Sequence, residues 1–208
     1  RQIDYYQINM ADQISQLNIT TVINNCVESQ SISSYWCRLI NRANDGTLST
    51  SGSFVSTPLF NLSEFDTSGI DLKFTYLLDT SFGELAFNNF TNILLNKDFK
   101  QDVSSDQINC KSLYRLGEED GLCYQPSPKI QNVFNLSLTK RIFNNPSQLG
   151  FTFRYIDNVD DSQKIGTALN IPFDSYSYFD LNFVTNLDKD LDILFGINNI
   201  LDEDPPVN

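Results

Sequence analysis

The sequence predicts an all-β fold built from about seven antiparallel strands. Seven segments alternate apolar and polar residues, which is the pattern of a strand with one apolar and one polar face. The connections between these segments alternate long and short along the chain. The composition agrees, because Phe (16) and Tyr (9) are abundant among the 208 residues and Met (1) is scarce, which favours strands and turns over helices.

The first half of the chain contains two predicted strands joined by a connection of about forty residues. The first strand covers about Ile3–Ile14, and the second runs from about Phe54 to Leu78. The clearest alternation is GIDLKFTYLL at 69–78, where the even-numbered residues are apolar and Asp71 and Lys73 lie on the other face. This second segment exceeds the about 9–11 residues of one membrane crossing, so it either projects beyond a bilayer or bends at 66–69.

The second half continues the same pattern. Its predicted strands are Glu84–Leu95, Lys129–Phe143, Gly150–Asn158, Ser175–Leu187 and Leu191–Leu201. Short turns are predicted at Asp79–Gly83, Asn144–Leu149 and Asp188–Asp190, because these stretches are short and rich in turn-forming residues.

The order of the connections favours a membrane barrel over a soluble sheet. In an antiparallel sheet every second connection lies at the same end, so one end would carry the long loops and the other only tight turns. Outer-membrane barrels have this asymmetry, with short periplasmic turns and long extracellular loops. A true turn at 66–69 would break the sorting, so we expect one continuous, bent strand there.

The strand faces agree with this interpretation. Phe, Leu and Ile on one face would contact outer-membrane lipid, and Asn, Thr and charged residues would face a wet lumen. We expect a lumen lining that includes Asp71, Lys73, Arg154 and Asp180, either along a transport route or as salt bridges and plug contacts. Tyrosines near strand ends would form an interfacial girdle; these are Tyr5, Tyr6, Tyr176 and Tyr178.

The four cysteines form two close pairs in the turn-rich connections. Cys26 lies near Cys37 and Cys110 near Cys123, and neither spacing is that of a zinc or thioredoxin-type motif. Three connectivities exist, of which we favour the two local disulfides. Such bonds indicate an oxidising compartment.

Charge and motifs exclude several function classes. The formal net charge is −12 and there is no His, which argues against a nucleic-acid partner. We expect no enzyme, no cofactor and no metal centre, because no nucleophile or paired-carboxylate motif is present. The acidic clusters read as solvated loops, with divalent-ion binding as the alternative; they are Glu118–Asp120, Asp157–Asp161 and Asp202–Asp204. No apolar run is long enough for a membrane helix.

Five stretches, in order, resemble the C-terminal part of the barrel of TonB-dependent outer-membrane receptors. They are YYQINMADQI (5–14), NLSEFDTSGIDLKFTY (61–76), PSPKIQNVFNLSLT (126–139), SYSYFDLNFV (175–184) and LFGINNILDEDPPV (194–207). The second is similar to the family's N-x-G-x-x-x-T-x-G-[IV]-[DE]-L strand, with Ser63 in place of the common Gly. Gly196–Asp202 is similar to the family's GVNNLFDK-like strand.

This resemblance implies a barrel of about 22 strands around an N-terminal plug, with these segments near strands fifteen to twenty-one. We therefore expect the chain to be one portion of that barrel domain, with the plug and final strand outside it. The family imports scarce nutrients such as siderophores, cobalamin, haem or glycans across the outer membrane of Gram-negative bacteria. Energy reaches it from the inner-membrane TonB complex through the plug.

The first long connection holds the candidate ligand contacts. Tyr35 and Trp36 could stack on a sugar or chelate, and Arg38 and Arg42 could pair with anions. The alternative is that these side chains pack the loop against itself.

A second class of protein also fits part of the pattern. A secreted β-sandwich that binds carbohydrate would explain Asn-x-Ser/Thr sequons, which occur at Asn18, Asn61, Asn89 and Asn135. Asn89 and Asn135 lie in the middle of predicted strands, where alternation of Asn with Ser or Thr produces the motif by chance.

Overall fold

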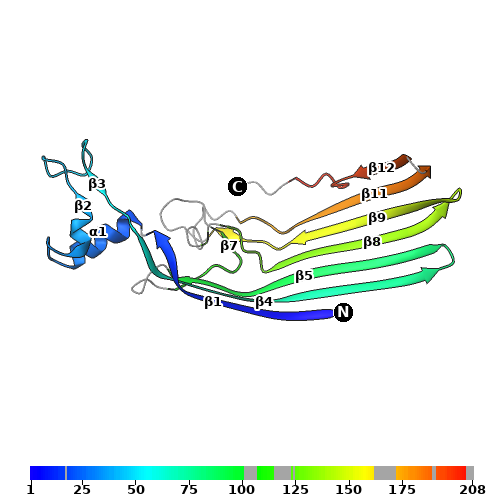
Figure 1. The fold of residues 1–208 in the computed structure, drawn as a ribbon, viewed down its shortest axis with the longest axis horizontal. Coiled ribbons are helices and arrows are strands. Elements are labelled where there is room, and N and C mark those ends of the chain that lie inside the picture. Colours follow the sequence, from blue (N-terminus) through cyan, green and yellow to red (C-terminus); the bar gives the residue numbers. More distant parts are fainter. Residues whose placement is uncertain are drawn as a thin grey trace.

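One large antiparallel sheet dominates the computed structural model, which describes residues 1–16, 18–100, 107–114, 123, 125–161, 172–188 and 191–204 (Figure 1). Its long strands lie side by side in chain order, so the all-β prediction is confirmed. They are β1 (Gln2–Gln16), β4 (Leu59–Thr80), β5 (Gly83–Lys100), β8 (Ile130–Ile142), β9 (Asn145–Ile156), β11 (Tyr176–Asp188) and β12 (Leu191–Ile197).

The predicted sorting of the connections is confirmed. All long connections lie at one end of the sheet, and the turns β4–β5 and β8–β9 lie at the other end (Figure 1). The loop end carries the short elements, which are α1 (Ile19–Glu28), α2 (Tyr35–Arg38), β2 (Ile40–Asn41), β3 (Phe54–Val55), β6 (Ile108–Asn109), β7 (Leu113–Tyr114) and β10 (Asp160–Asp161). The predicted turn at Asp188–Asp190 includes two residues outside the described part.

The prediction of a continuous strand through 66–69 is confirmed, but its start is wrong. β4 pairs with β1 on both sides of this stretch, as in Met10 with Phe65 and Tyr5 with Ile70. Its first residue is Leu59, and Phe54 belongs to the separate strand β3. Pro58 lies between the two strands, and proline cannot donate a ladder hydrogen bond.

The predicted turn at Asn144–Leu149 is wrong. The turn consists of Phe143 and Asn144, whose φ values are 51° and 65°, and β9 already begins at Asn145. A two-residue loop with both φ values positive matches the twist of a hairpin. Near the C-terminal end of the sequence, β12 ends at Ile197, four residues before the predicted strand end at Leu201.

Two short helices were not predicted. The Asn18 Oδ1 accepts a hydrogen bond from the Thr20 backbone N–H at the start of α1, and the Ser34 Oγ accepts one from Cys37 N–H in α2. Such capping satisfies the free N–H groups of a helix start. The first four residues of α1, ITTV, are all β-branched, and such residues have a low helix propensity. Propensity alone therefore does not predict this helix. Neither helix has the length and apolarity needed to cross a membrane.

Toward the turns, the strand register places most of the large apolar side chains on one face of the sheet, because residues opposite each other in an antiparallel pair share a face; the pairs Phe90–Val133 and Val184–Leu194 lie on the other face. One row across six strands is Tyr76, Phe87, Leu136, Phe151, Leu181 and Ile197. We call this surface the apolar band; it comprises 70, 72, 74, 76 and 78 on β4, 85, 87 and 93 on β5, 134, 136 and 138 on β8, 149, 151 and 153 on β9, 179, 181 and 183 on β11, and 193, 195 and 197 on β12.

Three polar side chains interrupt the apolar band and satisfy one another. The Asn132 Nδ2 donates to Asn89 Oδ1 (2.8 Å) and to Thr91 Oγ1 (2.6 Å), and the Asn89 Nδ2 donates to Thr91 Oγ1 (3.0 Å). Mutual hydrogen bonding removes much of the cost of polar groups on an apolar surface.

The sheet is a single layer in the described part of the chain. Apart from Leu94 on β5, the buried apolar side chains of the described residues lie at the loop end, namely Val22, Cys110, Tyr114, Cys123 and Val159. Within the apolar band, Phe195 remains 58% exposed and Ile193 43% exposed. The small sheets β2–β3 and β7–β10 lie at the loop end and do not cover the band (Figure 1). A surface of this size and apolarity marks an interaction surface.

Candidate functional site at the loop end of the sheet

The two faces of the sheet exchange polarity at Gly69. Toward the turns, the band face is apolar and the opposite face carries Asp71 and Lys73. Toward the loops, the band face becomes polar, and the Asn9 Nδ2 donates to Asp66 Oδ1 across it (2.7 Å). The opposite face becomes apolar there, with Tyr6, Ile8, Met10, Phe65 and Phe99. A one-residue bulge in β5 accompanies the exchange, since Leu94 pairs with Gly69 and Asn96 with Ser68.

The four predicted lumen residues share the face opposite the apolar band, which we call the polar face. Lys73 and Arg154 lie in one row, through Phe90 and Val133. Asp180 follows one row nearer the turns, and Asp71 one row nearer the loops. The structure brings Arg154 and Asp180 into contact and leaves Asp71 and Lys73 on a distant strand.

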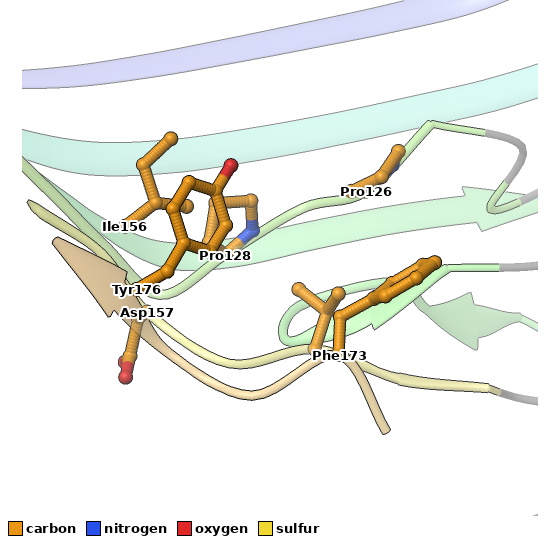
Figure 2. Close-up of a pocket in the computed structure, with 7 residues that line it drawn as sticks. Pro126, Pro128, Ile156, Asp157, Phe173 and Tyr176 are labelled. Atoms are coloured by element: carbon orange, nitrogen blue, oxygen red, sulfur yellow. The ribbon is translucent and has the colours of Figure 1, made fainter. Parts of the chain in front are cut away.

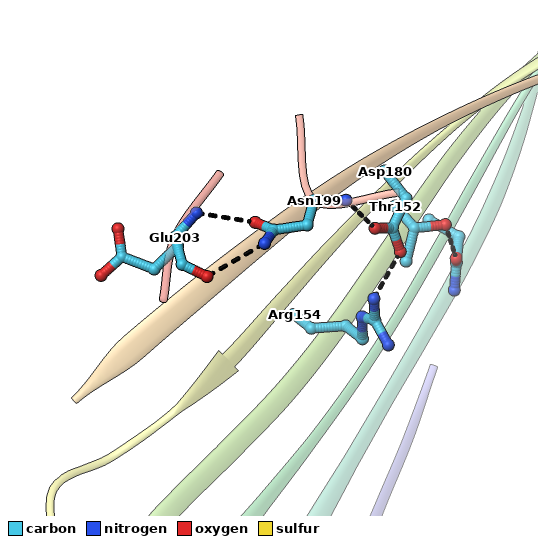
Figure 3. A network of polar contacts seen from close by, with 6 residues as sticks. Thr152, Arg154, Asp180, Asn199 and Glu203 are labelled. Carbon is cyan, nitrogen blue, oxygen red and sulfur yellow. Dashed lines mark hydrogen bonds and ion pairs between the residues drawn. The ribbon is translucent and has the colours of Figure 1, made fainter. Parts of the chain in front are cut away.

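Asp180 is the centre of a small network on the polar face (Figure 3). Its Oδ2 lies 2.7 Å from Arg154 Nη2, and its Oδ1 accepts the backbone N–H of Asn199 at 2.9 Å. The Arg154 guanidinium also lies over the Tyr178 ring, 5.7 Å from its centroid. The carboxylate therefore ties β9 and the segment after β12 to β11. On β4, Asp71 Oδ1 accepts from Asn92 Nδ2 at 2.7 Å.

Only one of the four tyrosines predicted for the interfacial girdle lies on the face of the apolar band. Tyr5 shares the face of Ile70 and thus of the apolar band, whereas Tyr6, Tyr176 and Tyr178 lie on the polar face. Period-2 alternation alone cannot say which face a strand end presents, because the register with the partner strand decides it.

A pocket of about 230 Å³ opens on the polar face where the sheet meets the loops (Figure 2). Its lining residues come from three separate stretches of chain, and they are Pro126, Pro128, Ile156, Asp157, Val159, Phe173 and Tyr176. Backbone hydrogen bonds in both directions join Val159 to Phe173 (3.0 and 2.9 Å). These bonds hold the two sides of the third connection together.

The second and third connections form a compact unit beside this pocket. β7 and β10 pair in parallel, with Tyr114 opposite Asp161. The Tyr114 ring is 1% exposed and lies 4.4 Å from the Phe173 ring, centroid to centroid. Burial, with the negative charges of Asp161 and Asp160, raises the pKa of the Tyr114 hydroxyl. The sequence contained no signal for this association, because the two strands are two residues each.

The four predicted ligand contacts lie together in the first connection, away from the pocket. Tyr35 and Trp36 pack edge to face, with ring centroids 5.5 Å apart, and Arg42 Nη1 donates to the Gly46 carbonyl (3.1 Å). Arg38 ends α2 and is exposed. These contacts agree with packing of the loop against itself.

The predicted local disulfides are confirmed. Cys26 is bonded to Cys37, and Cys110 to Cys123. The first bond joins α1 to α2, and the second closes the connection that contains β7. No group of three or more acidic, Cys or His side chains in the described residues is arranged to hold a metal ion; the acidic cluster Glu118–Asp120 lies outside those residues.

Comparison with known proteins identified no relative of this chain. No family model matches the chain, and no significant match was found among curated proteins or solved structures.

Proposed function

We propose that this chain is part of the barrel of a TonB-dependent receptor that imports a scarce nutrient across the outer membrane of a Gram-negative bacterium. The observation that carries the proposal is the apolar band on a single-layer sheet whose other face, at the same level, carries Asp71, Lys73, Arg154 and Asp180. Water would be expelled from such a band only by lipid or by another layer of protein. The sequence motifs described above give the same assignment by resemblance.

The height of the band supports lipid as its neighbour. On β4 it runs from Ile70 to Leu78, and the eight steps between these nine residues, at about 3.4 Å each, measure about 27 Å along the strand. A tilted membrane strand needs about 9–11 residues. Above the band the same face carries Asp66, and below it carries Thr80 and Lys140, as expected where headgroups and water begin.

The edges of the sheet support further strands as partners. Within the described residues, β1 pairs only with β4, and β12 only with β11. An open strand edge in lipid leaves backbone N–H and C=O groups without hydrogen bonds, which costs several kcal/mol per group. We therefore propose that other strands of the same polypeptide close the barrel, and that its N-terminal plug contacts the polar face and the TonB complex.

The β-sandwich alternative requires a second sheet on the apolar band. The described residues supply no such sheet, and their two small sheets lie at the loop end (Figure 1). This observation favours the barrel.

Collision-rate measurements on spin labels test the proposal directly. Labels at Leu136→Cys on the band and at its neighbour Ser137→Cys on the polar face form a matched pair in the centre of the sheet. In native outer membranes, the Leu136 label should collide often with oxygen, which dissolves in lipid, and rarely with a water-soluble nickel complex. The Ser137 label should have the lower oxygen collision rate. A Leu136 label shielded from both reagents would indicate a protein layer and overturn the proposal.

Transport needs a separate measurement. Uptake of ferric siderophores, haem, cobalamin and oligosaccharides should be compared in cells with and without functional TonB. Import of one of these classes should require TonB. Equal uptake of all of them in both strains would contradict the importer assignment.

A further inference from the structure

The pocket at the loop end is built almost entirely from apolar surfaces. Pro126 and Pro128 form one wall, Ile156 and Tyr176 rise from paired positions on β9 and β11, and Phe173 closes the loop side (Figure 2). Flat aromatic and proline surfaces facing one cavity favour a flat apolar occupant.

The size of the pocket limits what it can hold. A cavity of about 150 Å³ accommodates benzene, whereas sites for whole drug-sized ligands measure about 300–1,000 Å³. The volume here, about 230 Å³, lies between these values. The pocket therefore suits one substituted ring of a ligand and leaves the remainder of that ligand outside.

The charge around the pocket selects an uncharged ring. No Lys or Arg is among the lining residues in the described part of the chain. The only acid among them, Asp157, directs its carboxylate away from the Tyr176 and Pro128 rings (Figure 2), and its Oδ1 accepts the Tyr155 hydroxyl at 3.1 Å. A charged group inside would lose its hydration without gaining a partner.

The neighbouring surface extends this preference. Above Gly69 the polar face becomes apolar, and Ile8 and Met10 are 49% and 41% exposed there. In the proposed barrel this surface faces the interior at the external mouth. A ligand entering the mouth would therefore meet these apolar side chains, and Lys97, whose Nζ donates to Ser127 Oγ (2.7 Å), before it reached Asp71 and Lys73 deeper on the same face.

We propose that the pocket binds an uncharged aromatic ring carried by the imported nutrient. An aromatic ring fits better than a sugar, because a sugar carries several hydroxyls that each need a hydrogen-bond partner, and the described lining side chains offer only the Tyr176 hydroxyl and the Asp157 carboxylate. The inference rests on the proposed importer function for the source of the ligand, and on the pocket alone for its chemistry.

Fluorine NMR on the full-length protein in nanodiscs tests this inference. The probe is 4-fluorobenzyl alcohol, with 2-deoxy-2-fluoroglucose as the sugar comparison and empty nanodiscs as the lipid reference. The aromatic probe should bind above the lipid background and the sugar should not. Phe173→Ala should weaken the aromatic probe about fivefold through loss of one ring contact. Phe143→Ala, which removes an exposed Phe (95%) at the opposite end of the sheet, should leave its affinity unchanged.

A second variant guards against simple misfolding, because Phe173 also packs on Tyr114. Ile156→Trp leaves the Phe173–Tyr114 contact in place and fills the cavity with a larger side chain, so it should abolish probe binding while the circular dichroism spectrum stays that of the parent protein. Unchanged affinity in this variant, or equal losses in Phe173→Ala and Phe143→Ala, would overturn the ring pocket. These results are independent of the spin-label test. If the Leu136 label faces lipid but no ring binds, only the ring pocket is refuted. If the ring binds but protein covers the Leu136 label, only the importer assignment is refuted.

Discussion

The Tyr6 ring lies directly across Gly69 of the neighbouring strand, at the level where the two faces of the sheet exchange polarity. The two residues are partners in the β1–β4 register, and a Cβ atom placed on Gly69 would overlap the Tyr6 phenol. The Tyr6 hydroxyl also receives a hydrogen bond from Asn92 Nδ2 (3.4 Å). A tyrosine thus covers the exposed backbone of a strand glycine, as in other sheets where an aromatic residue compensates for a glycine.

Substitution of this glycine should weaken the pairing of β1. In Gly69→Ala the added methyl group displaces the Tyr6 ring and its hydrogen bond to Asn92, so we expect a loss of about 1–3 kcal/mol in the free energy of unfolding. Urea titration followed by far-UV circular dichroism measures it. The control is Gly196→Ala, because its Cβ would meet the Leu181 carbonyl only at 3.7 Å. Equal effects of the two substitutions would contradict this account.

Asp180 should control the order of the segment that follows β12. Asp180→Ala removes the acceptor for the Asn199 N–H, and a hydrogen bond to a carboxylate contributes about 1.5–3 kcal/mol. Amide hydrogen exchange at Asn199 should accelerate at least about tenfold. Asp180→Asn keeps an oxygen for that N–H and should accelerate exchange less.

Asp192→Ala is the matched control for this experiment. Asp192 lies on β12 and accepts from the Asn186 side chain (2.5 Å), so its loss should leave exchange at Asn199 unchanged. Faster exchange in this control would mean that any lost carboxylate loosens the edge of the sheet, and the specific role of Asp180 would be refuted.

Alkaline pH should loosen the unit formed by the second and third connections. The pKa of Tyr114 is raised above its ordinary value of 10.0, so the folded state holds this proton more tightly than the unfolded state does. The resulting stabilisation is complete below pH 10 and is lost as the pH rises through the raised pKa. Tyr114→Phe should remove this pH dependence.

The difference in absorbance at 295 nm between the parent protein and Tyr114→Phe follows ionisation of this one tyrosine. The difference should appear only above pH 10, together with faster proteolysis of the connections in the parent protein. An ionisation step below pH 10 would show that the hydroxyl is hydrated in solution. Matching circular dichroism spectra at neutral pH would establish that the Phe variant is folded.

Local periodicity was sufficient to predict the seven strands and their faces in the centre of the sheet. On β11, for example, Phe179 and Phe183 alternate with Asp180 and Asn182, and the polarity of neighbouring residues in one strand is fixed by the chain itself. The loop sorting and the two local disulfides also follow from order and spacing along the chain. Boundaries were less predictable, because the hairpin at Phe143 depends on two positive φ values in residues that are not glycine.

The candidate site was predictable only in part. The sequence placed Arg154 and Asp180 on one face, and the structure added their contact and the third partner, Asn199. The sequence did not predict the pocket, because Pro128, Ile156 and Phe173 come together only when two long connections fold at the loop end of the sheet.

The sequence by itself thus determined which side chains alternate, the order of long and short connections and which cysteines lie within reach of each other, because each of these depends on the local order and spacing of residues along the chain. Only the tertiary structure decided that Tyr6 lies over Gly69, that polarity reverses at that level and that an apolar pocket forms at the loop end. Those features depend on the register between strands and on contacts between distant connections, and neither is encoded in the periodicity of a single segment.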